Sequence, residues 1–148
     1  MEIRNKRKRV RSGFTMIELV AMLIIIGLLA AVVGKNVMGK IETAKVTTTK
    51  ASLKILQSAV NQFKMDTGRY PTEEEGLTAL VEEPSDAPNW QSGGYLETTE
   101  VPKDGWSREF IYELNPASGK AFVIYSYGAD GEEGGEDNDA DLYSTDAY

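Results

Sequence analysis

Carboxylates are the side chains of this sequence with the most chemical potential, because the chain contains neither His nor Cys. It therefore lacks the commonest general base and metal ligand of proteins, and it has no thiol for a disulfide. Acidic residues concentrate in residues 128–141 (GADGEEGGEDNDAD), which hold seven acids and four Gly. Nothing apolar in this segment would raise a carboxylate pKa for acid catalysis. We therefore expect a protein that is not an enzyme, with a carboxylate-based hydrolase as a minor alternative.

Two interpretations of this acidic segment remain open on composition. Like charges in a Gly-rich stretch repel one another, which predicts a solvated and disordered tail. Calcium, however, takes about six to eight oxygen ligands, and Gly lets carboxylates and carbonyls converge from one short segment. The spacing is not that of an EF-hand, because Asp130-Gly131 lacks the preceding alternation of Asp or Asn and the closing Glu.

A different kind of carboxylate, Glu18, is the only charge within the apolar residues 14–34 (FTMIELVAMLIIIGLLAAVVG). At about 1.5 Å per residue this run predicts about 30 Å of helix, enough to cross a membrane. A carboxylate in hydrocarbon is costly unless it has a partner. Cleavage between Gly13 and Phe14 would supply one, the free α-ammonium of Phe14 in the same chain or in a neighbour. An ordinary signal peptide, cut at small residues after the run, is the alternative.

The charge of the chain is divided very unevenly. Residues 1–13 carry six Lys or Arg and one Glu, a net of +5, whereas the remainder carries ten basic and 22 acidic residues, a net of −12. A basic flank stays cytoplasmic, so the body should lie outside a bacterial inner membrane, and its acidity argues against nucleic-acid binding. We expect a cleaved cytoplasmic leader (1–13), a transmembrane and assembly helix (14–35) and a periplasmic head domain (36–148).

Helical periodicity continues beyond the apolar run and predicts one long helix over residues 15–66. Its apolar stripe, which we expect to pack on a sheet rather than bind a partner, consists of Leu53, Leu56, Val60 and Phe63, widened by Ile55 and Ala59. Gly68 is the expected C-terminal cap, followed closely by Pro71. Gly34 is the expected soft point, because Gly weakens a helix by about 1 kcal/mol relative to Ala.

The second half of the chain predicts short elements. Thr72 and Glu75 have the spacing of a capping box for a short helix within an irregular stretch, residues 69–108. Residues 109–114 and 121–127 are strand-like and flank a turn, which predicts an antiparallel hairpin. The expected fold class is therefore α+β, a long N-terminal helix packed on a small antiparallel sheet.

The N-terminal residues resemble the class III signal of type IV pilins and pseudopilins. The matching stretch is Gly13-Phe14-Thr15-Met16-Ile17-Glu18, between the basic leader and the apolar run. The resemblance implies that a prepilin peptidase cuts after Gly13 and N-methylates Phe14, and that Glu18 guides the subunit into a helical filament. Such relatives usually carry a Pro near the end of the apolar run, where this chain has Val33-Gly34-Lys35.

The rest of the chain resembles the major pseudopilins, or G subunits, of type II secretion systems. The matching segments are GRYPT (68–72), EGLTAL (75–80), GGYL (93–96), VPKDGW (101–106), YGADG (127–131) and GGE (134–136). This implies a type IV pilin-like fold and a homopolymeric periplasmic pseudopilus that drives protein export across the outer membrane. The implied partners are the prepilin peptidase, minor pseudopilins and an inner-membrane assembly platform. A major type IV pilin of a surface fibre is the alternative.

The same resemblance implies a structural calcium ion in the acidic C-terminal loop. The implied ligands are the side chains of Asp130, Asp137 and Asn138 and the backbone carbonyls of Tyr127 and Glu132. Asn138 stands where a second carboxylate is frequent in the family, so that Asp139 or Asp141 could substitute. With the resemblance, we expect a calcium loop rather than a disordered tail.

Overall fold

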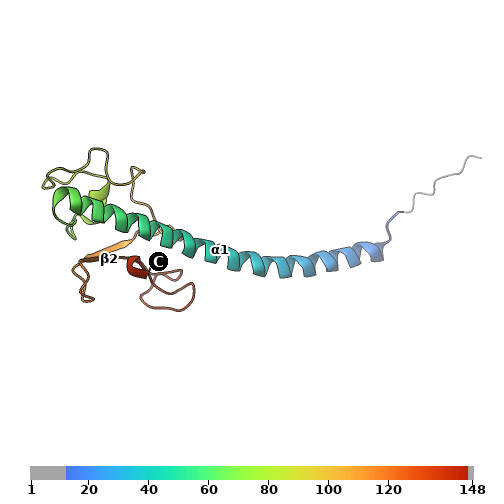
Figure 1. The fold of residues 1–148 in the computed structure, drawn as a ribbon. Coiled ribbons are helices and arrows are strands. Elements are labelled where there is room, and N and C mark those ends of the chain that lie inside the picture. Colours follow the sequence, from blue (N-terminus) through green and yellow to red (C-terminus); the bar gives the residue numbers. More distant parts are fainter. Residues whose placement is uncertain (1–12, 147–148) are drawn as a thin grey trace, which may run out of the picture. The chain divides into compact units, whose positions relative to one another are not determined.

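The computed structural model describes residues 13–146, apart from the side chains of residues 35 and 36. The elements are α1 (Met16–Thr67), the 3-10 helix η1 (Gly76–Leu80), β1 (Ile111–Leu114), β2 (Phe122–Ser126), β3 (Leu142–Tyr143) and the 3-10 helix η2 (Ser144–Asp146). A long helix and a small antiparallel sheet confirm the predicted α+β class (Figure 1). The chain divides into two compact units between Met38 and Gly39.

Helix α1 confirms the predicted long helix to within one residue at each end, since it runs from Met16 to Thr67. It is continuous at Gly34, the expected soft point. Gly68 ends it as predicted: its φ of +82° is a conformation that glycine adopts without strain, and its N–H donates to the carbonyl of Lys64 at 2.9 Å. That hydrogen bond satisfies one of the last carbonyls of the helix.

The core of the unit after Met38 is built on the predicted stripe of α1. Leu53, Leu56, Val60 and Phe63 are all 0% exposed. They form one cluster with Leu80 of η1 and Ile124 of β2, among others. Full burial of such side chains stabilises a fold by about 1.5–3 kcal/mol each. This stripe therefore contributes strongly to holding the sheet and η1 against α1.

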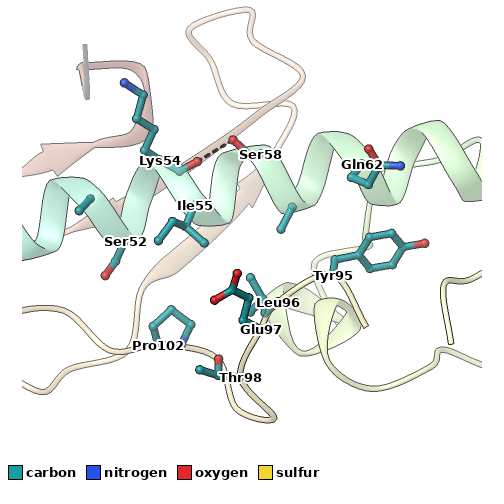
Figure 2. Close-up of a pocket in the computed structure, with 12 residues that line it drawn as sticks. Ser52, Lys54, Ile55, Ser58, Gln62, Tyr95, Leu96, Glu97, Thr98 and Pro102 are labelled. Atoms are coloured by element: carbon teal, nitrogen blue, oxygen red, sulfur yellow. Dashed lines mark hydrogen bonds between the residues drawn. The ribbon is translucent and has the colours of Figure 1, made fainter. Parts of the chain in front are cut away.

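Ile55 was expected to widen the stripe, and that expectation is wrong. Its side chain is 57% exposed and lines a groove of about 890 Å³ between α1 and the segment after Tyr95. Figure 2 shows Ile55 pointing from α1 toward Leu96 and Pro102. The reason is angular, because a residue two positions after Leu53 lies well round the helix from the buried face.

The sheet has the order β1-β2-β3, and both pairs are antiparallel. The predicted hairpin is confirmed, with Ile111 opposite Tyr125 and Leu114 opposite Phe122. Strand β3, which the sequence did not reveal, is only two residues long and pairs Leu142 with Ser126. It brings the chain back beside β2 and thereby closes the acidic segment into a loop.

The irregular stretch between α1 and β1 is held by Arg69 and by the reciprocal hydrogen bonds of Thr72 and Glu75. Thr72 N–H donates to Oε2 of Glu75 at 2.9 Å, and Glu75 N–H donates to Oγ1 of Thr72 at 3.2 Å. These two bonds close the turn before η1 but do not cap it: the N-cap residue of this 3-10 helix is Glu75, without a side-chain cap, so the prediction that the pair caps the helix is wrong. Both terminal nitrogens of Arg69 donate to the Glu75 carboxylate at 2.7 Å. Mainly through this pairing, the pKa of Glu75 is lowered to about 2.

Candidate functional site

The N-terminal end of α1 carries a capping box that our reading of the sequence missed. The backbone N–H and the hydroxyl of Thr15 donate to Oε2 of Glu18 at 2.7 and 2.9 Å, and the N–H of Glu18 donates to Oγ1 of Thr15 at 3.3 Å. The signal was present as the pattern Thr-x-x-Glu before an apolar run. The carboxylate of Glu18 therefore has a hydrogen-bond partner in Thr15, the residue that directly precedes α1.

The predicted cleavage site lies just outside this cap. Gly13 and Phe14 precede the first residue of α1, and both are exposed, Phe14 to 70%. A peptidase must reach the backbone on both sides of the bond it cuts, and exposed residues outside a helix permit that. Gly13, Phe14 and Glu18 thus lie within six residues, with the Thr15–Glu18 cap directly after the predicted cleavage site.

The apolar part of α1 is a continuous hydrophobic surface without protein cover. Its large side chains from Met16 to Val33 are between 46% and 82% exposed. Within residues 13–146, α1 is the one helix long and apolar enough to cross a membrane. A soluble monomer rarely exposes so large an apolar area, and surfaces of this kind are typical of membrane or protein–protein interaction sites.

The acidic segment folds into a closed loop. Its backbone hydrogen bonds, all between 2.9 and 3.1 Å, run from Ala129 N–H to Asn138 O, from Gly131 N–H to Tyr127 O, from Asp139 N–H to Glu136 O and from Asp141 N–H to Gly134 O. Gly128 is required at the closure, because a Cβ there would lie 2.5 Å from the carbonyl oxygen of Asp139. The backbone next to Asp130 therefore lies beside that of Asn138.

The expected calcium ligands are placed in this loop with their side chains toward solvent. Asp130, Asp137, Asn138 and Asp139 are exposed, as is Glu132, whereas Tyr127 is half-buried. Oδ1 of Asp130 accepts a hydrogen bond from Glu132 N–H at 3.1 Å. Among the described residues, no three acidic side chains converge as a metal site by themselves. An ion here would thus depend on backbone carbonyls, as the expected ligand set does.

The surroundings of one acid of the loop, Asp141, show whether the segment suits a cation. Its Oδ1 is buried and, among the described residues, has no hydrogen-bond partner. Its Oδ2 accepts from Gly134 N–H and from the Tyr143 hydroxyl, each at 3.1 Å. Burial, together with this contact, raises the pKa of Tyr143. A buried carboxylate oxygen is costly without a partner. The side chains and carbonyls of the loop offer oxygen atoms as metal ligands, and hard cations such as calcium prefer these ligands. The residues therefore fit a calcium ion.

Two further charged residues, Asp104 and Arg108, adjoin the loop and were not singled out from the sequence. The Asp104 side chain is only 1% exposed and is matched by the Arg108 Nε at 3.5 Å. The Arg108 guanidinium also donates to the carbonyl of Gly128, which begins the acidic loop. No local pattern indicates this contact, because Gly128 lies 20 residues further along the chain.

Comparison with known proteins identifies relatives over nearly the whole chain. A family profile described as type II secretion system (T2SS), protein G, matches residues 36–145. The type II secretion system core protein G of Pseudomonas aeruginosa is 42% identical over 139 residues, covering 92% of this chain and 96% of that protein. The core protein G of Vibrio cholerae is 35% identical and covers 93% of each chain.

A solved structure agrees with these relatives. The crystal structure of the major pseudopilin from the type 2 secretion system of enterohaemorrhagic Escherichia coli matches with a TM-score of 0.59 and 29% identity. The match covers 73% of this chain and 92% of that chain. The likeness therefore extends from sequence to fold.

Proposed function

This chain belongs to the type II secretion system protein G family, and from that premise we propose that it is the major structural subunit of a pseudopilus. As such it polymerises into a periplasmic filament that drives protein export across the outer membrane. The relatives are named for secretion, and no feature of residues 13–146 favours the alternative of a surface pilin. A structural role is supported by the match to the solved structure of a major pseudopilin.

The observation that carries this function is the uncovered apolar surface of α1 before Met38 in a chain whose second unit has its own core. The large apolar side chains from Phe14 to Val33, each at least 46% exposed, can be covered by lipid before assembly and by other copies of α1 afterwards. A helix that serves both states suits a subunit stored in the membrane and consumed by a filament. The head, whose core is complete, can remain folded throughout.

Processing and orientation follow from the leader. The basic residues of 1–13 favour a cytoplasmic N-terminus, so that the head lies in the periplasm. A prepilin peptidase then cuts between Gly13 and Phe14 and methylates the new N-terminus of Phe14. Minor pseudopilins and an inner-membrane assembly platform complete the set of partners, as the family membership supports.

Glu18 is the proposed assembly residue. Before cleavage its carboxylate accepts both hydrogen bonds from Thr15, which lowers the cost of a charge in the apolar helix. After cleavage the α-ammonium of Phe14, four residues away, offers a charged partner in the same or a neighbouring subunit. A charge pair between subunits fixes the axial position of one helix against the next.

Calcium is the proposed structural ion of the loop. The residues that would hold it are Asp130, Asp137 and Asn138 with the carbonyls of Tyr127 and Glu132, and either Asp139 or Asp141 can contribute a further carboxylate. The unpartnered Oδ1 of Asp141 supports this proposal. Bound calcium would neutralise part of the loop's negative charge and stabilise the folded head. The seven acids would otherwise repel one another within 14 residues.

The experiment that tests the function is deletion of the gene in the native host, followed by an assay of secreted proteins. Exported proteins should accumulate in the periplasm, and the wild-type chain supplied in trans should restore their release. Normal secretion without the chain, together with loss of surface fibres, would show that the protein is a surface pilin instead.

A further inference from the structure

Arg108 connects two parts of the head that are remote in sequence. One side of its guanidinium faces Asp104, whose Oδ2 lies 3.5 Å from Nε. The other side donates from Nη2 to the carbonyl oxygen of Gly128, and Nη1 lies so close to Gly131 that a Cβ there would collide with it. The guanidinium therefore lies directly on the first turn of the acidic loop.

Asp104 keeps Arg108 in this place. The Asp104 side chain is 1% exposed, and its Oδ1 accepts from the backbone N–H groups of Trp106 at 2.9 Å and Arg108 at 2.8 Å. Its Oδ2 accepts from the Ser126 hydroxyl at 2.7 Å. A buried carboxylate is costly without a cationic partner, so the guanidinium cannot swing away cheaply. The indole of Trp106 packs beside it, with the Arg108 Cζ 5.6 Å from the ring centroid.

We propose that Arg108 is a positioning residue for the acidic loop. Its guanidinium holds the turn from Gly128 to Gly131 in the folded geometry before any cation binds, so that calcium completes the loop rather than creating it. The statement that calcium completes the loop rests on the calcium site of the proposed function. The statement that Arg108 holds the turn concerns the loop without a metal ion.

The turn contains two amide groups that report on this order. Ala129 N–H donates to Asn138 O at 2.9 Å, and Gly131 N–H donates to Tyr127 O at 3.0 Å. Both hydrogen bonds depend on the turn that the guanidinium holds. If Arg108 orders the turn, these amides are protected from exchange even in a chelator, and calcium adds further protection.

The test is hydrogen–deuterium exchange of the full chain in detergent, read by mass spectrometry of peptides covering Tyr127–Gly131, in EDTA and in a calcium titration. The variants are Arg108→Gln, which removes the charge, and Arg108→Lys, which keeps the charge but loses the planar fork. The control is Lys120→Gln, which removes a positive charge from an exposed position in the β1–β2 turn.

In EDTA, exchange in this peptide should rise about tenfold in both Arg108 variants, as expected for loss of a charge-assisted hydrogen bond, and should not change in Lys120→Gln. Both Arg108 variants should also need about tenfold more calcium to regain protection. Peptides from β1 and β2 should stay unchanged.

Unchanged exchange in Arg108→Gln would overturn the proposal. So would wild-type exchange in Arg108→Lys, because the effect would then come from charge alone. An equal rise of exchange in β2 would also overturn it, because the substitution would then lower the stability of the whole head. If calcium protects no variant, the calcium site fails, whereas the EDTA result still decides the role of Arg108. None of these readouts requires a filament.

Discussion

The hydroxyl oxygen of Thr49 accepts a hydrogen bond of 2.8 Å from the backbone N–H of Gly105, which lies 56 residues further along the chain. Thr49 is 0% exposed, and its own hydroxyl donates to the carbonyl of Lys45 at 2.8 Å. This pair attaches the segment before β1 to α1. The same segment carries Asp104 and Arg108, so the position of the acidic loop depends on it.

Replacement of Gly105 by Ala should destabilise the head. The new Cβ would lie 2.5 Å from the carbonyl oxygen of Lys45, and helix backbone cannot give way as a flexible side chain can. We expect a loss of about 2 kcal/mol or more in the free energy of unfolding, measured by urea denaturation. Gly39→Ala is the control, because its Cβ would meet nothing within 4 Å and should be neutral or stabilising. Equal stability of the two variants would contradict the close approach at Gly105.

Glu75→Gln should change how stability depends on pH. The folded-state pKa of Glu75, about 2, lies below its ordinary value of 4.5, so this carboxylate contributes stability that is fully present above pH 4.5 and lost as the pH falls toward 2. At pH 7 we expect the variant to lose about 2 kcal/mol, since it breaks the double hydrogen bond from Arg69. Between pH 4.5 and 2, the variant should lose less stability than the wild type.

The measurement is a series of urea denaturation curves across that pH range. Glu74→Gln, at an exposed neighbouring position, is the matched control and should follow the wild type. Parallel pH curves for Glu75→Gln and the wild type would show that Arg69 and Glu75 do not interact as the structure has them.

Removal of calcium should lower the melting temperature of the head. If calcium binds the folded loop, a concentration of 100 times Kd stabilises it by about 2.7 kcal/mol, or on the order of 10 °C. Asp130→Asn should lose most of this increment, because it removes a ligand charge while leaving an oxygen for the turn to Glu132. Glu133→Gln, in the same loop but outside the expected ligand set, should retain it. A melting temperature that ignores both EDTA and calcium would remove calcium from the account.

Glu18→Gln should abolish assembly without unfolding the head. Gln can still accept the hydrogen bonds from Thr15, so the start of α1 is preserved while the charge is lost. We expect filament yield to fall about tenfold or more and the melting temperature to stay unchanged, because a neutral side chain cannot pair with the ammonium of Phe14. Electron microscopy and thermal denaturation check the two halves. Wild-type filament yield would show that the Glu18 charge has no role in assembly.

Much of the fold could be predicted because its signals are local. The 3.6-residue period gave the buried stripe of α1, Gly68 gave its end, and alternating runs gave the β1–β2 hairpin. Strand β3 could not be seen, because two residues carry no periodicity and pair only through the loop that precedes them. Ile55 was misplaced because it was assigned to the stripe by its apolar type, although its position two residues after Leu53 puts it well round the helix from the buried face.

The residues of the candidate site also differ in whether local sequence patterns indicate them. Gly13, Phe14 and Glu18 could be found from their order along the chain, and Thr15 could have been found from its spacing to Glu18. Arg108 and Asp104 could not, because their importance arises from contacts with Ser126 and Gly128, about twenty residues away. Long-range polar contacts leave no pattern in a single sequence.

The most direct test of the central claim is the intact mass of the chain recovered from a sheared filament fraction of the native host. We expect the chain to be present in filaments and to have the mass of residues 14–148 with an added methyl group on Phe14. Recovery of the chain only from the inner membrane, with residues 1–13 still attached, would contradict it.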